Sequence, residues 1–253
     1  MQALNIFQNK LTHAMDKAYC SIWNERNIEH NWYEAWNTAL MAIFFDIPQA
    51  GVAPQKSLDV SRRLLDERVA ELDNNNNNDD AGNLSDTPSH ATIPAPDRVE
   101  RFPDFAVTLT LEPEGENECR VSHAVGDSAA VLVEVKKYVS RHLDVGGARF
   151  MNSMANLLRE AETDVYAQAL HAFVRHPHLT SIWAIGTCGP WWSGALIERQ
   201  NIAVELNDFI RDTNTQGLMP RIAFSGAVML NIQDESWEEI RQWLVDLVGA
   251  LAG

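Results

Sequence analysis

The sequence predicts an α/β (α+β) fold in which a mixed β-sheet is flanked by helices. Apolar residues recur at helical spacing before residue 73 and again over residues 151–175. From residue 105 the spacing changes to the alternation of strands. The resulting order of helices, strands, helix, strands and helix is typical of a layered domain. With 253 residues, 45% of them apolar, the chain can form a sizeable core.

The chain divides into three predicted parts. Residues 1–73 form a helical N-terminal part that packs on the core, and we expect its helices over residues 2–23, 32–45 and 58–72. Residues 74–98 are rich in Asn, Asp, Ser and Pro and have too few apolar side chains to offset the entropy of ordering, so they predict a disordered, flexible loop. Residues 99–253 form the core, which ends in a C-terminal helix.

Alternating apolar residues predict the strands of this core. Residues 103–113, 119–125 and 129–139 read as an antiparallel three-strand meander. The helix over residues 151–175 follows and ends at His176-Pro177.

Further strands are expected after this helix. They cover residues 181–189, 195–206 and part of 221–232, and Pro190–Gly194 forms a turn between the first two. Asp234 or Ser236 caps the last helix.

Charge and cysteine content limit the classes of function. The net charge of −15 opposes non-specific nucleic-acid binding, which depends on Lys and Arg neutralising phosphates. Nucleic-acid chemistry would therefore need a local groove and metal ions. Three scattered cysteines without a CxxC pair argue against a zinc site or a disulfide framework, and they favour an intracellular protein, cytoplasmic or nuclear. No apolar run is long enough to span a membrane, so we expect no membrane partner.

Three ionisable residues form a candidate site for metal-dependent chemistry. Glu134 and Lys136 lie on the same face of their strand because side chains alternate, and Asp104 opens another strand of the predicted meander. Two carboxylates suffice for Mg²⁺ when water and a phosphate supply its other ligands. The lysine would orient or deprotonate the attacking water. The plainer interpretation is that Asp104 is a turn residue and that Glu134 and Lys136 form a solvent-facing ion pair.

The motifs RFPDFAV, with Asp104, and VLVEVKK, with Glu134 and Lys136, resemble the PD-(D/E)XK phosphodiesterase superfamily. The resemblance covers about residues 100–206 and implies a restriction-endonuclease-like sheet. It implies metal ligation by Asp104, Glu134 and Val135, with Mg²⁺ or Mn²⁺ as the ion. The chain also resembles fungal proteins that have a long Asn/Ser/Pro-rich insertion before the PD motif.

The same resemblance bears on two further positions. Some families of the superfamily have a glutamine on the following helix, and Gln168 matches it, so the implied catalytic set is Asp104, Glu134, Lys136 and Gln168. Gln168 also falls near the centre of an apolar helical stripe, where an amide needs partners; bonding to the backbone is the alternative. The superfamily's extra acid on a preceding helix has four candidates, of which Glu34 is favoured; the others are Glu29, Glu67 and Glu71.

The sequence therefore predicts a metal-dependent nuclease, a hydrolase that acts on DNA or RNA. The alternative is a catalytically inactive protein of the same fold that serves as a binding or scaffolding module, which the acidic charge favours. Predicted partners are a nucleic acid and either a protein partner or a second copy of the chain. Trp191 and Trp192 could stack on nucleobases, but core packing is the favoured interpretation.

Overall fold

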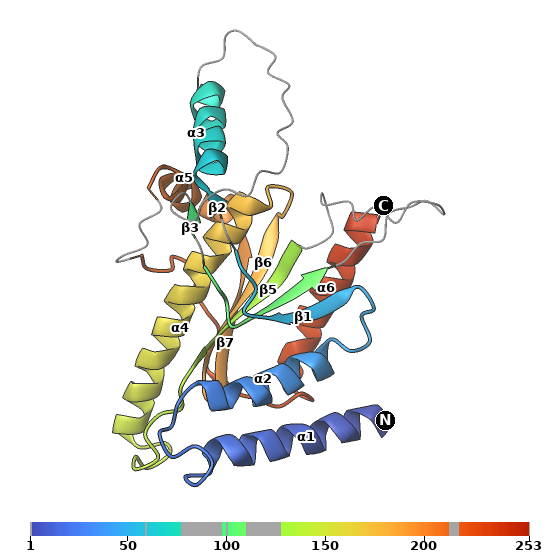
Figure 1. The fold of residues 1–253 in the computed structure, drawn as a ribbon, viewed down its shortest axis with the longest axis vertical. Coiled ribbons are helices and arrows are strands. Elements are labelled where there is room, and N and C mark those ends of the chain that lie inside the picture. Colours follow the sequence, from blue (N-terminus) through green and yellow to red (C-terminus); the bar gives the residue numbers. More distant parts are fainter. Residues whose placement is uncertain are drawn as a thin grey trace.

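The computed structural model describes residues 2–58, 60–76, 98–99, 101–109, 128–212 and 218–252. These residues form a mixed six-stranded sheet, a two-stranded sheet and six α-helices, as Figure 1 shows. The α/β class and the mixed sheet are thus confirmed. The helices are α1 (Gln2–Tyr19), α2 (His30–Ile43), α3 (Arg62–Asn76), α4 (Ala148–Arg175), α5 (Ala203–Arg211) and α6 (Ser236–Ala252), with a 3₁₀ helix, η2 (Arg199–Ile202).

The large sheet has the strand order β1-β4-β5-β6-β7-β8. Its strands are β1 (Ala50–Pro54), β4 (Phe105–Leu109), β5 (Ser128–Lys136), β6 (Ser181–Cys188), β7 (Trp191–Glu198) and β8 (Val228–Met229). Only the β5–β6 pair is parallel among these, and α4 makes the long crossover that a parallel pair requires. The two-stranded sheet pairs β2 (Val60–Ser61) with β3 (Arg98–Val99).

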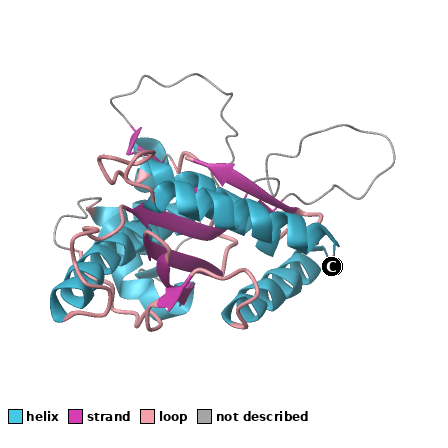
Figure 2. Ribbon diagram, turned by 90° about the horizontal axis from the view of Figure 1, so that it is seen from below, coloured by secondary structure: helices cyan, strands magenta, loops and turns pink. Residues whose placement is uncertain are grey.

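Both faces of the large sheet are covered, and Figure 2 shows helices on either side of it. Val131, Val133 and Val135 of β5 face a core built with α1, α2 and α6. Ala129 and Leu132 face the opposite core, to which α3, α4 and α5 contribute. Central strands are therefore apolar on both sides, and a polar side chain within β5 needs a specific partner.

Several predicted elements need correction. β4 and β5, the first and third strands of the predicted meander, pair directly with each other, and β1 pairs with the other side of β4. The predicted strand over residues 119–125 lies outside the described residues. Two strands were not predicted: β1 lies between the predicted helices over residues 32–45 and 58–72, and β2 replaces the start of the latter.

The chain after residue 189 also differs from the prediction. Trp191–Gly194 belongs to β7 rather than to a turn, and the chain turns at Gly189-Pro190. The predicted strand over residues 195–206 ends at Glu198 and continues as η2 and α5, because Leu206, Phe209 and Ile210 fall at helical spacing and are buried together. The first three residues of the predicted loop, Asn74–Asn76, end α3, and residues 77–97 lie outside the described residues.

Two predictions about the C-terminal part are confirmed. Asp234 accepts a hydrogen bond from the backbone N–H of Ser236 at 2.9 Å, at the start of α6. Trp192 is buried and stacks on Trp237 of α6, with ring centroids 4.3 Å apart, as core packing requires. None of the helices in the described residues has the length and apolarity to cross a membrane.

Candidate functional site

Asp104 lies at the junction of three elements. It immediately precedes β4, whose buried apolar residues fix the end of the strand in the sheet. Its Oδ2 accepts a hydrogen bond from the backbone N–H of Val135 in β5, with N and O 2.7 Å apart. Its Oδ1 accepts a hydrogen bond from the Tyr33 hydroxyl of α2. The carboxylate is therefore held beside the Glu134–Lys136 end of β5.

Glu134 and Lys136 lie on the α4 face of β5, as their spacing predicts. The Oε1 atom of Glu134 accepts a hydrogen bond from Lys136 Nζ at 2.8 Å, and its Oε2 accepts one from Gln168 Nε2 at 2.8 Å. The Glu134 side chain is only 12% exposed, so this is not a solvent-facing ion pair. Gln168 is buried, and its amide nitrogen bonds a carboxylate rather than the backbone.

Lys136 has a second carboxylate partner that the sequence did not reveal. Asp164 of α4 lies 2.7 Å from Lys136 Nζ through its Oδ2. Asp164 precedes Gln168 by four residues, so both side chains lie on the same face of the helix. This spacing was the available signal, but it becomes informative only once α4 is known to cross β5.

Burial raises the pKa of both acids. The pKa of Asp104 is raised mainly by desolvation; the hydrogen bonds from Tyr33 and Val135 oppose this, and the negative charge of Glu29 adds to it. Desolvation also raises the pKa of Glu134, and the neighbouring charge of Asp104 adds to it. The negative charge of Asp104 thus makes it harder for Glu134 to ionise, as a nearby like charge does.

The basic and phenolic groups are shifted as well. Burial acts to lower the pKa of Lys136, but Glu134 and the hydrogen-bonded Asp164 outweigh it and raise the pKa above its usual value. The pKa of Tyr33 is raised by burial and by its bond to Asp104. At neutral pH, Lys136 is therefore a cation and Tyr33 a neutral hydrogen-bond donor.

Four predicted site residues, Asp104, Glu134, Lys136 and Gln168, are brought together. Val135 contributes its backbone N–H to Asp104, whereas its side chain is buried on the opposite face of the sheet.

The four candidates for the extra acid differ in their surroundings. Glu34 forms an ion pair with Lys17 of α1 at 2.6 Å. Glu67 and Glu71 pair with arginines of their own helix, α3. Among the four candidates, Glu29, immediately before α2, is the one whose charge acts on Asp104.

The donor set limits how a metal ion would be held. Among the described residues, no group of three or more His, Cys, Asp or Glu side chains is arranged to hold a metal ion. Asp104 and Glu134 offer two carboxylates, and each of their four oxygens accepts one of the hydrogen bonds described above. A carboxylate has about four lone-pair sites, so a free lone pair remains on each oxygen. The buried Oε1 of Gln168 has no hydrogen-bond partner. These residues fit a hard cation that completes its coordination with water or phosphate oxygens.

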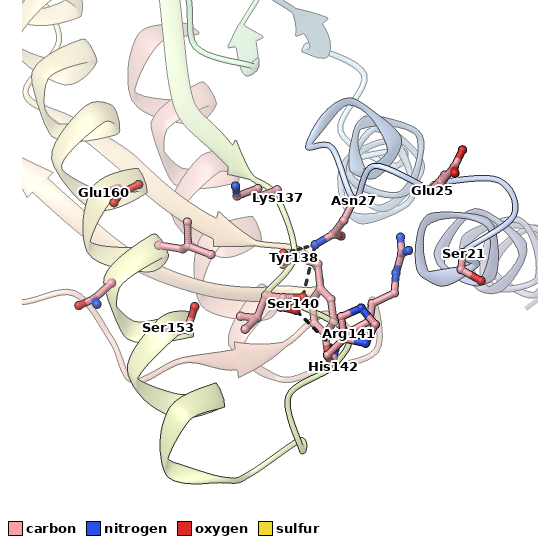
Figure 3. A pocket seen from close by; sticks show the side chains of 13 residues that line it. Ser21, Glu25, Asn27, Lys137, Tyr138, Ser140, Arg141, His142, Ser153 and Glu160 are labelled. Carbon is pink, nitrogen blue, oxygen red and sulfur yellow. Dashed lines mark hydrogen bonds between the residues drawn. The ribbon is translucent and has the colours of Figure 1, made fainter.

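A pocket of about 760 Å³ is lined by residues of the α1–α2 loop, of the segment after β5 and of the first half of α4, as Figure 3 shows. Lys137, next to Lys136, and Glu160, one helical turn before Asp164, both line it. The lining therefore includes chain neighbours of the site residues, whereas Asp104, Glu134, Lys136 and Gln168 are not part of it.

Comparisons with protein-family models, with curated proteins and with solved structures found no match for this chain.

Proposed function

We propose that this protein is a metal-dependent nuclease that hydrolyses phosphodiester bonds of DNA or RNA on a restriction-endonuclease-like, PD-(D/E)XK fold. One observation carries the proposal. Asp104, just before β4, accepts a hydrogen bond from the backbone of Val135, next to Glu134 in β5, and Glu134 is bonded to both Lys136 and Gln168. The tripeptide Glu134–Lys136 alone could be a surface ion pair. Two partly buried carboxylates that hold a lysine between side chains need interactions that offset the cost of removing their charges from water.

Asp104 and Glu134 would hold the cation. When bound, Mg²⁺ or Mn²⁺ would lower the pKa of a ligating water and stabilise charge on the phosphate. The free lone pairs of the two carboxylates are the available ligand positions. Tyr33 and the Val135 N–H fix the Asp104 carboxylate, while Gln168 fixes that of Glu134.

Lys136 would act as a positive charge close to the reacting phosphate. Its raised pKa favours orienting water and stabilising negative charge over accepting a proton. Asp164 and Glu134 hold the ammonium group from two sides. Tyr33, Asp164 and Gln168 therefore act as positioning residues.

Cleavage of labelled DNA and RNA tests the proposal. The purified protein is assayed with Mg²⁺ or Mn²⁺ beside Glu134→Ala and Lys136→Ala, with Lys10→Ala, an exposed lysine of α1, as the control. We expect the site variants to lose at least about a hundredfold in rate, the scale of losing a transition-state charge contact. Equal activity in the wild type and in both site variants would remove the nuclease assignment.

A second candidate is a binding or scaffolding module without turnover. The net charge of −15 and the two carboxylates on Lys136 favour it, because both weaken attraction for a polyanion. Calorimetry that finds no Mn²⁺ binding, together with a tight protein ligand, would support this module and exclude the enzyme.

A further inference from the structure

The pocket of Figure 3 is lined by residues that neighbour the site residues along the chain on three segments. Asn27 lines the pocket two residues before Glu29, Lys137 follows Lys136, and Glu160 lies one turn before Asp164. The residues that shape the site are thus next to pocket residues on each wall. A polymer whose reacting bond lies at Asp104 and Glu134 would extend into this pocket.

The lining carries polar side chains that suit a sugar–phosphate chain. It offers two cations, Lys137 and Arg141, and hydroxyl or amide groups on every wall. The hydroxyl and amide residues are Ser21, Asn27, Ser140, Ser153 and Asn156. Lys137 is exposed. These are the side-chain types that contact phosphates and sugars in nucleic-acid complexes.

Two buried polar atoms on the wall have no partner. Arg141 donates through Nη2 to the Asn24 carbonyl at 2.5 Å, but its Nε is buried and makes no hydrogen bond. Asn27 donates through Nδ2 to the Tyr138 carbonyl at 2.7 Å, but its Oδ1 is buried and unpaired. Both atoms are closed off from solvent, so a ligand in the pocket would contact the exposed groups of the lining instead.

Asn27 is also held in an unusual backbone conformation. Its φ is +50°, a left-handed conformation that asparagine tolerates better than most residues. The bond from its side chain to Tyr138 anchors the α1–α2 loop against the segment after β5. The pocket wall is therefore fixed rather than formed by a loose loop, and such local strain is typical of binding sites.

The charge of the lining limits the type of nucleic acid. Lys137 and Arg141 are balanced by Glu25 and Glu160. Duplex DNA carries one negative charge for about every 1.7 Å of its axis, so duplex binding calls for many more cations than two. The pocket has the volume for a short stretch of one strand.

We propose that this pocket binds a short segment of single-stranded nucleic acid, so that the enzyme acts on single strands or strand ends rather than on intact duplex. The inference rests on the proposed nuclease function. Lys137 contacts a backbone phosphate, and Ser140, Ser153 and Asn156 contact the sugar–phosphate chain.

Strand binding without catalysis tests the proposal. Fluorescence anisotropy is measured with labelled oligo-dT, oligo-U and a duplex of the same length, in EDTA and over a series of salt concentrations. We expect both single strands to bind more tightly than the duplex. Lys137→Ala should weaken single-strand binding about fivefold and make the log–log salt slope shallower by about 0.7, whereas Lys10→Ala should leave both unchanged.

A second pair of variants blocks the pocket without removing charge. Ser153→Trp places a bulky ring in the pocket, while Asn152→Trp adds the same ring to the neighbouring exposed position of α4. Ser153→Trp should abolish single-strand binding at an unchanged Tm, and Asn152→Trp should bind like the wild type. Tighter binding of the duplex, or equal binding by both members of either pair, would overturn the inference.

The two proposals fail in different ways. Strand binding that depends on Lys137 and Ser153, without any cleavage in Mg²⁺ or Mn²⁺, would keep the pocket and remove the nuclease. Cleavage that is lost in Glu134→Ala but unchanged in Lys137→Ala and Ser153→Trp would keep the nuclease and remove the pocket.

Discussion

The amide nitrogen of Gln168 lies 2.8 Å from Oε2 of Glu134, so α4 and β5 meet through a charged hydrogen bond in a buried part of the protein. Gln168→Leu removes the donor, so Oε2 of Glu134 loses this hydrogen bond. Because this bond favours the ionised form, the pKa of Glu134, already raised mainly by burial, should rise further. An NMR titration of the Glu134 carboxyl carbon in the variant and in the wild type measures this pKa. A Glu134 pKa that is unchanged or lower would contradict the role assigned to Gln168.

Glu134→Gln should stabilise the protein at pH 8. Burial raises the pKa of Glu134, so the folded state holds the proton more tightly than the unfolded state, and stability is lost as pH rises from 4.5 through the folded pKa. The amide avoids this cost, so the variant should exceed the wild type in unfolding free energy at pH 8, and the advantage should disappear near pH 4. Urea unfolding at both pH values measures it. If the unfolding free energy of the variant relative to that of the wild type is lower at pH 8 than at pH 4, the ion pair with Lys136 outweighs the desolvation of Glu134.

Gly186→Ala should destabilise the contact between α4 and β6. An added Cβ would lie 3.0 Å from the backbone nitrogen of Glu162 and 3.2 Å from the Cβ of Ala161, so the helix would have to move. We expect a loss of about 1–3 kcal/mol in unfolding free energy. Gly226→Ala is the control, since its Cβ would meet nothing within 4 Å, and it should change stability by less than about 0.5 kcal/mol. Equal effects from both substitutions would refute the close packing of α4.

His171 should make the fold sensitive to acid. Its ring is buried against Phe209, both ring nitrogens lack hydrogen-bond partners, and burial, aided by Arg101, lowers its pKa to about 4. Between these pKa values the unfolded chain binds a proton at His171 and the folded chain does not. The free energy of unfolding therefore falls as pH falls from 6.5 toward 4, by about 3 kcal/mol at most. His171→Leu should reduce the difference in unfolding free energy between pH 7 and pH 5. The exposed His13→Gln should leave it unchanged, and a variant at position 171 that also leaves it unchanged would refute the assignment.

The strong strands and the main site pattern could be predicted because they depend on local periodicity. The alternation over residues 129–139 put Glu134 and Lys136 on one face, and the structure places them there. β1 was missed because Ala50–Pro54 contains Gly and Pro and lies at the sheet edge, where strand signals are weak. The strand over residues 195–206 was overextended because its apolar residues fit both periods.

The partners of the site depend on tertiary placement rather than spacing. Asp164 meets Lys136 across 28 positions of the chain because α4 crosses β5. Glu29 acts on Asp104, whereas the favoured Glu34 faces Lys17 of α1. The sequence offered four acids, of which Glu34 was favoured, and only their placement in the fold distinguishes their surroundings.

Titration calorimetry with Mn²⁺ tests whether Asp104 and Glu134 hold one cation together, as the proposed nuclease site requires. The wild type should bind one Mn²⁺ ion per chain, Asp104→Asn and Glu134→Gln should each lose that binding, and Glu34→Gln should retain it. Absence of Mn²⁺ binding by the wild type, or unchanged binding by both site variants, would contradict the account.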